Sequence, residues 1–125
     1  MALAKEMMGG GLSAGQAQAI NGQYNAIVAA GSAQGDATTL TSGMSIVTAA
    51  DGTKGVILPA GQVGDEVTIF NNSASTLKVY PPSGAAIAVV GTGVGSANTA
   101  HSALTYKTVT YTCFSSTQWV PMVST

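Results

Sequence analysis

Short runs in which apolar and polar residues alternate constrain the fold of this chain more than any other feature. The alternation is clearest over Glu66–Asn71, Thr76–Tyr80 and Thr108–Phe114. A period of two places one set of side chains in a core and the other set outside it. Gly, Pro, Ser and Asn separate the runs, as they do in turns. The sequence therefore predicts an all-β fold.

The turn residues divide the chain into short candidate strands. These are Ala37–Leu40, Ser45–Ala49, Gly55–Leu58, Glu66–Asn71, Thr76–Tyr80, Ala86–Val90, Ala103–Tyr106, Thr108–Phe114 and Gln118–Met122. Ala26–Ala29 fits either a helical turn or a first strand, and we favour the strand. Asn72–Ser75 has hairpin length. Closely spaced short strands predict a compact, jelly-roll-like β-sandwich or barrel over residues 31–125.

Residues 1–30 are predicted to form a separate N-terminal region. Met1–Leu12 is a glycine-rich apolar arm, because three consecutive glycines disfavour a regular element. Ser13–Ile20 fits a short helix with Ser13 as N-cap. The arm could fold back on its own body, but we favour docking on a neighbour, since methionine suits irregular apolar surfaces. The candidate contact residues are Leu3, Met7, Met8, Leu12 and Ile20.

Composition excludes several classes of function. Charged residues make up 7% of the chain, the net charge is −1, and the four basic residues are all lysines. Nucleic-acid binding needs clustered basic residues, so none is expected. No apolar stretch approaches the length of a membrane span, and no secretory signal is evident. So little charge favours a surface covered by copies of the chain or by a larger structure.

No pattern of reactive residues predicts an enzyme, a cofactor or a metal site. His101 is the only histidine, lies in a predicted loop and has no partner for a metal. Asp65 and Glu66 are adjacent, so on a strand they face opposite sides. Val90–Gly95 lacks the glycine spacing and following helix of a dinucleotide loop. Cys113 shares the parity of core residues, which predicts a small buried side chain.

Trp119 offers two interpretations. Its bulk favours a place capping the core of the barrel. The alternative is an exposed Trp119 that stacks on a sugar ring together with Tyr106 or Tyr80, which would make the chain a carbohydrate-binding module.

A second group of aromatic and proline residues suggests a subunit interface. Phe70 and Tyr80 fall on the outward parity of their strands, and Tyr80 precedes Pro81 and Pro82. Aromatic residues are enriched at interfaces. These four residues are therefore candidates for a trimer interface. Alternatively, the face assignment is inverted and the aromatics belong to the core of a second sheet.

Several segments together resemble a family of small virion proteins. They are Ser13–Gly22, Ala29–Gln34, Ala37–Leu40, Gly55–Ala60, Gly64–Val67, Asn71–Asn72, Leu77–Ile87 and Phe114–Trp119. The chain from about Leu12 onward resembles the capsid decoration (cement) proteins of tailed double-stranded DNA bacteriophages. Similar β modules occur in tail and fibre proteins. One departure is Ala88–Gly91, which stands where family members often have an Asn-Gly turn.

The resemblance implies a homotrimer on the outer capsid surface of the virion. Its partners would be two further copies and the major capsid protein, gripped by the N-terminal arms. The expected role is to stabilise the shell against the pressure of packed DNA. A tail, fibre or head–tail component is the main alternative, and a carbohydrate-binding module is the further one. The sequence leaves open the host, the lattice site, the copy number and the residues that contact the shell.

Overall fold

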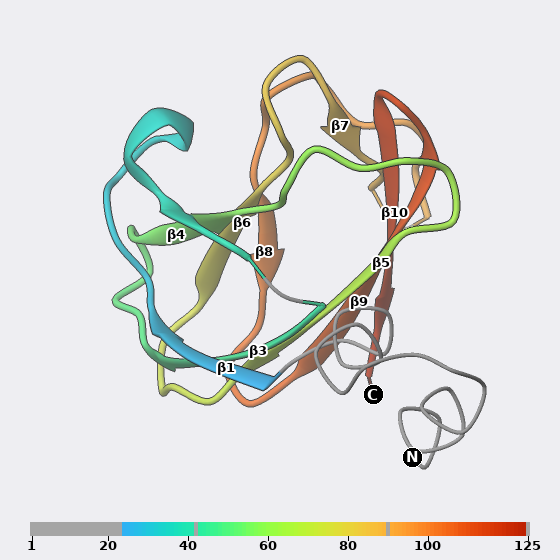
Figure 1. Ribbon diagram of the computed structural model, residues 1–125. Coiled ribbons are helices and arrows are strands. Elements are labelled where there is room, and N and C mark those ends of the chain that lie inside the picture. Colours follow the sequence, from blue (N-terminus) through green and yellow to red (C-terminus); the bar gives the residue numbers. More distant parts are fainter. Residues whose placement is uncertain (1–23, 42, 90, 125) are drawn as a thin grey trace, which may run out of the picture.

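The computed structural model describes residues 24–41, 43–89 and 91–124, which form strands and one short 3-10 helix (Figure 1). The elements are β1 (Tyr24–Val28), η1 (Gln34–Asp36), β2 (Thr38–Thr39), β3 (Met44–Ala49), β4 (Gly55–Ile57), β5 (Glu66–Asn71), β6 (Leu77–Tyr80), β7 (Ala86–Ile87), β8 (His101–Ala103), β9 (Thr108–Ser115) and β10 (Gln118–Val123). The prediction of an all-β fold is confirmed.

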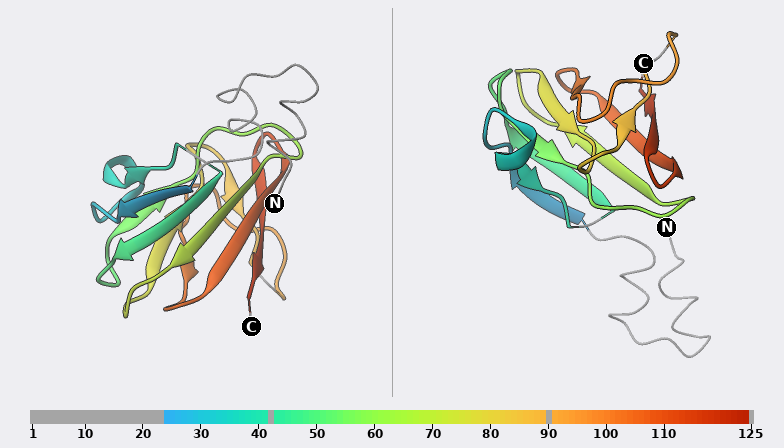
Figure 2. Two further views of the ribbon diagram at one scale, coloured as in Figure 1. Left: turned by 60° about the horizontal axis from the view of Figure 1, so that its bottom comes forward. Right: turned by 90° about the horizontal axis from the view of Figure 1, so that it is seen from above.

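Two sheets face each other and make a sandwich (Figures 1 and 2). The six-stranded sheet has the order β1-β3-β5-β9-β10-β7, and the four-stranded sheet has the order β2-β4-β6-β8. The chain crosses from one sheet to the other at each step from β1 to β6. Each sheet therefore gains a parallel neighbour every second strand.

This winding produces a mixed topology. Among the described strands, five pairs are parallel, and three pairs are antiparallel. A jelly roll is built from antiparallel Greek keys. The jelly-roll connectivity of the prediction is therefore not confirmed, whereas two packed sheets are observed.

The core lies between the sheets and is built from the inward parity of nearly every strand. It contains Ala29, Leu40, Val47, Val56, Leu58, Val67, Ile69, Leu77, Val79, Ala85, Ile87, Ala103, Val109, Tyr111, Cys113 and Trp119. Trp119 is fully buried and Cys113 is a buried free thiol, as predicted. Gly61 in the β4–β5 loop lies against the Trp119 ring, where an added Cβ would come within 2.6 Å of it.

Most predicted strands are present with shifts of one or two residues, and the strand favoured at Ala26–Ala29 appears as β1. The predicted hairpin at Asn72–Ser75 is wrong, because β5 and β6 belong to different sheets. There the buried Asn71 side chain donates hydrogen bonds to the carbonyls of Ser75 and Ala103, at 2.8 and 3.1 Å. These bonds hold the connection that leads from β5 in the six-stranded sheet to β6 in the four-stranded sheet.

The predicted strand Ala103–Tyr106 is also misplaced. β8 covers His101–Ala103, so His101 lies on a strand and not in a loop. The chain then turns at Tyr106, whose φ is +57°. A bulky residue rarely takes this left-handed conformation, and here the amide of Tyr106 donates to the carbonyl of Asn71 at 2.9 Å.

The predicted arm Met1–Leu12 and helix Ser13–Ile20 lie outside the described residues, as does the contact candidate Ile20. The division into residues 1–30 and 31–125 stays a prediction. β1 precedes residue 31, yet it pairs in parallel with β3 and so belongs to the six-stranded sheet.

Candidate docking face

On the outward side of the six-stranded sheet, most of the described side chains are apolar or threonine, and we call this side the outer sheet face. Its residues, assigned from strand parity and register, are Ala26, Met44, Ile46, Thr48, Glu66, Thr68, Phe70, Thr108, Thr110, Thr112, Phe114, Val120 and Met122. Met122 and Phe114 are 75% and 62% exposed. Glu66 is the one charged residue in this set.

Strand register places these side chains in rows that cross the sheet. One row runs Ala26–Ile46–Phe70–Thr108. The next contains Met44, Thr68, Thr110 and Met122. Rows of this kind are the units through which neighbouring strands stabilise each other. The same alignment places apolar side chains next to threonines along each row.

The threonines hold part of this surface in place. The hydroxyls of Thr68 and Thr110 lie 3.1 Å apart and share a hydrogen bond across β5 and β9. The Thr48 hydroxyl donates to the carbonyl of Ile27 at 3.3 Å. Hydroxyls engaged in this way need little from solvent, so a partner can cover them at low cost in desolvation.

The outward side of the four-stranded sheet is partly covered by the chain itself. Residues 31–37, drawn in cyan at the upper left of Figure 1, contact β4 through η1. The Asp36 carboxylate accepts hydrogen bonds from the amides of Ser32 and Ala33, at 3.1 and 2.9 Å. The Tyr80 hydroxyl reaches the carbonyl of Ser32 at 3.4 Å.

The structure separates the four candidates for a trimer interface. Tyr80 is 8% exposed, and Pro81 is fully buried within the chain. The interpretation of Tyr80 as an outward surface aromatic is therefore wrong: the 31–37 segment covers it, and Gly55 beside it leaves room for its ring. Pro82 is half-buried, while Phe70 is half-buried on the outer sheet face.

The two sheets are joined inside the sandwich by His101 and Tyr111. The His101 Nδ1 lies 2.8 Å from the Tyr111 hydroxyl, and their rings meet edge to face. Burial lowers the pKa of His101 and raises the pKa of Tyr111 well above its usual range. Both groups are therefore neutral near pH 7. The pKa of Cys113 is raised chiefly by burial and, to a smaller extent, by the negative charge of Asp65. The raised pKa keeps this thiol protonated.

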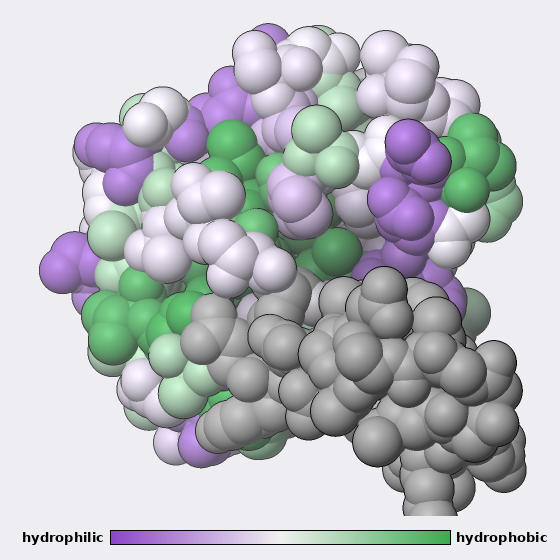
Figure 3. All heavy atoms as spheres, viewed as in Figure 1, coloured by the Kyte–Doolittle hydropathy of each residue, from purple (hydrophilic) through white to green (hydrophobic). Residues whose placement is uncertain are grey.

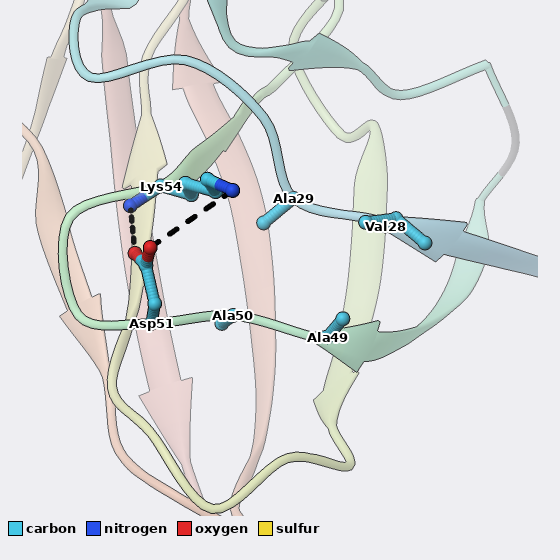
Figure 4. A pocket seen from close by; sticks show the side chains of 6 residues that line it. All are labelled: Val28, Ala29, Ala49, Ala50, Asp51 and Lys54. Carbon is cyan, nitrogen blue, oxygen red and sulfur yellow. Dashed lines mark hydrogen bonds and ion pairs between the residues drawn. The ribbon is translucent and has the colours of Figure 1, made fainter.

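A small pocket of about 100 Å³ lies between the ends of β1 and β3 (Figure 4). It is lined by Val28, Ala29, Ala49, Ala50, Asp51 and Lys54. The Asp51 carboxylate, whose pKa is lowered chiefly by the Thr53 hydroxyl, accepts the Lys54 amide at 3.1 Å and pairs with its ammonium group at 3.9 Å. These polar groups therefore satisfy one another.

Charge is sparse over the described surface. In the view of Figure 3, strongly hydrophilic residues form separate clusters between apolar ones. Within residues 24–41, 43–89 and 91–124, no three His, Cys, Asp or Glu residues gather as metal ligands would. The same described segments contain no helix that is long and apolar enough to span a membrane.

Comparison with protein-family models gave no match, and comparison with curated protein sequences gave none either. The sequence argument found Phe70 but did not single out Ile46, Val120 or Met122. The signal for them was available: each stands at the outward position of a strand where a polar residue is expected.

Proposed function

We propose that this chain is a virion structural protein, most plainly a homotrimeric capsid decoration protein that stabilises the outer shell. The supporting observation is the outer sheet face, a low-charge surface of threonine and apolar side chains. A freely diffusing protein is better served by a charged surface. The resemblance of segments such as Gly55–Ala60 and Leu77–Ile87 to decoration proteins supports the same proposal.

The proposed mechanism is mechanical. Packed DNA pushes capsid subunits apart, and a trimer seated across a junction bridges them. Each arm would add apolar contacts through Leu3, Met7, Met8 and Leu12, worth about 1.5–3 kcal/mol for each fully buried side chain. Three linked arms bind with avidity, because the second and third engage at high effective concentration. The body in this proposal is the sandwich with the mixed topology that is observed, and jelly-roll connectivity is not required for it.

The alternatives differ in what they need from the molecule. A tail, fibre or head–tail component would use the same fold in few copies. A carbohydrate-binding module built on an exposed Trp119 is not compatible with the complete burial of that ring. Two locations in the virion therefore remain in the proposal, the capsid surface and the tail region, and they differ in the expected number of copies.

Copy number per virion is the test of this proposal. Quantitative mass spectrometry against the major capsid protein is expected to give hundreds of copies, at a fixed fraction of the shell lattice. A handful of copies would move the protein to the tail or a vertex. None would overturn the virion role.

The role of the arm has its own test. A variant lacking residues 2–12 is expected to lose capsid binding while its circular dichroism keeps the β signature. Wild-type occupancy of capsids by this variant would overturn the proposed arm contact.

A further inference from the structure

We propose that the free protein forms a weak end-to-end dimer, in which Tyr106 of each copy enters the pocket between the ends of β1 and β3 in the other copy. This contact gives the pocket an occupant and gives a strained, exposed aromatic residue a role. It concerns the isolated chain and holds or fails independently of the virion role.

Tyr106 occupies a backbone position that favours glycine. The Lys107 amide donates to the Leu104 carbonyl at 3.2 Å, which closes a turn with Tyr106 as its third residue. A φ of +57° at this position is typical of a type II turn, where glycine is preferred. The Tyr106 amide donates to the Asn71 carbonyl, and the Asn71 amide donates to the Lys107 carbonyl, so two residues stand opposite one. This is a β-bulge of the class whose left-handed first residue is ordinarily glycine.

Packing within the chain does little to offset this strain. Tyr106 is 60% exposed, so only a minor part of its ring is covered. Leu104, at the first position of the same turn, is 53% exposed. Bulges re-aim side chains, and tyrosine is enriched among the residues that dominate the binding energy of interfaces. The conformational cost at Tyr106 is therefore offset by a contact outside its own chain.

The pocket suits the outer part of a phenol ring. Its volume is about 100 Å³, and its apolar walls are small side chains: Val28, Ala29, Ala49 and Ala50. A closed cavity of about 150 Å³ holds a whole benzene ring. Figure 4 shows the polar side of the pocket, where the hydrogen bonds from Thr53 and Lys54 to the Asp51 carboxylate all end on Oδ1. Oδ2 lies 3.9 Å from the Lys54 ammonium group and can accept a hydrogen bond from the Tyr106 hydroxyl.

The two features lie at the same end of the sandwich. In the left view of Figure 2, the β3–β4 connection and the β8–β9 turn are both at the lower end. β1, β3 and β5 are parallel, and the Tyr106 turn is bonded to Asn71, where β5 ends. Two strand spacings, about 10 Å, separate β3 from β9. A twofold axis between two facing ends therefore brings each Tyr106 onto the pocket of the other copy.

Size and charge at this end fit a weak contact between copies. Stable interfaces bury about 1,200–2,000 Å², and two turns entering two small pockets bury less than that. The contact needs no ion pair between copies. Asp51 and Lys54 pair with each other at the rim of the pocket, so Lys107 beside the entering ring meets a neutral pair. We therefore expect a dimer that forms only as the protein concentration rises.

Sedimentation equilibrium of the full chain at increasing concentration is the first test, and we expect the mass to double. Tyr106→Gly suits the left-handed backbone, so it should abolish the doubling while the urea midpoint of the dilute protein does not fall. Val63→Ser is the matched control, because Val63 is 72% exposed in the β4–β5 loop at the other end, and it should still double. A constant wild-type mass, growth beyond doubling, or doubling that survives in Tyr106→Gly would overturn the contact. A urea midpoint well below that of the wild type would overturn the role given to the strain.

A mixing experiment tests where the ring goes. Ala49→Leu fills the pocket but keeps Tyr106, whereas Tyr106→Gly keeps the pocket but lacks the ring, so a pair of one each retains one complete contact. The methyl signals of Ala29, Ala49 and Ala50 are followed by NMR in ¹³C-labelled Tyr106→Gly. We expect them to shift when unlabelled Ala49→Leu is added and to stay in place when unlabelled Tyr106→Gly is added. Signals that stay in place in both mixtures, with both variants folded, would overturn insertion into this pocket.

Discussion

The two sheets of this sandwich differ in how their outer sides are completed. The four-stranded sheet is partly covered by residues 31–37 of the same chain, which bury Tyr80 against Gly55. Among the described residues, the outer sheet face of the six-stranded sheet has no such cover and presents half-buried Ile46 and Phe70. A sheet side closed by its own chain contributes to stability, whereas one left open with little charge is suited to a partner.

The largest expected difference compares two aromatics on opposite outer sides. Tyr80→Ala is expected to lower the free energy of unfolding by about 3–5 kcal/mol, because it leaves a cavity under the 31–37 segment. Phe70→Ala, at a half-exposed position, should cost about 1 kcal/mol. Urea unfolding measures both. Equal losses of unfolding free energy in the two variants would contradict the inference that Tyr80 is more closely packed under residues 31–37 than Phe70 is on the outer sheet face.

Gly55 tests how closely the cover of the four-stranded sheet is packed. A Cβ at this position would lie 2.7 Å from the Lys78 carbonyl and 2.8 Å from the Tyr80 ring. Gly55→Ala is therefore expected to destabilise the protein by about 1–3 kcal/mol. Gly35→Ala in η1 is the control, since no atom lies within 4 Å of its added Cβ. Equal melting temperatures for Gly55→Ala and Gly35→Ala would contradict close packing around Gly55.

Asp36 tests what holds the covering segment in its shape. Asp36→Ala removes the acceptor for the amides of Ser32 and Ala33, which should cost about 1–2 kcal/mol. Asp36→Asn keeps an acceptor oxygen and should retain most of the stability. Hydrogen exchange at residues 31–37 should accelerate in the alanine variant. Unchanged exchange there would mean that the carboxylate does not order the segment.

The smallest expected effect on stability concerns His101, whose contact with Tyr111 joins the two sheets inside the sandwich. Burial lowers the pKa of His101 below its ordinary value of 6.5, so between these two pKa values the unfolded chain binds a proton that the folded chain does not. The contribution of neutral His101 to stability is therefore fully present above pH 6.5 and is lost as the pH falls through the lower, folded-state pKa. Because His101 is the only histidine, urea unfolding of a His101→Gln variant should lose this slope. A slope that persisted would place its origin elsewhere.

Local patterns were sufficient for the strands but not for their partners. Glu66–Asn71 was predicted with the bounds that β5 has, since a period of two over six residues is a strong signal. The same argument joined β5 to β6 as a hairpin, because a four-residue connection is typical of one. It could not foresee that Asn71 bonds to the β8–β9 turn and directs the chain into the other sheet.

The candidate face shows the same limit at the level of single residues. Alternation identified the outward position of Phe70, which lies on the outer sheet face, and of Tyr80, which lies buried. Nothing in the local pattern distinguishes them, since both are aromatics at outward positions near a strand end. The distinction depends on residues 31–37, which are far from Tyr80 in sequence and near it in space.

The sequence by itself determined that this chain forms β-strands, that Cys113 and Trp119 belong to the core, and that its surface carries little charge, because these properties follow from local alternation, side-chain bulk and composition. Only the tertiary structure decided that the chain alternates between two sheets with parallel neighbours, that Tyr80 is covered, and that Ile46, Phe70, Val120 and Met122 share one face of a sheet. The physical reason is that register and cover are set by contacts between residues distant in sequence, and those contacts form only when the sheets come together.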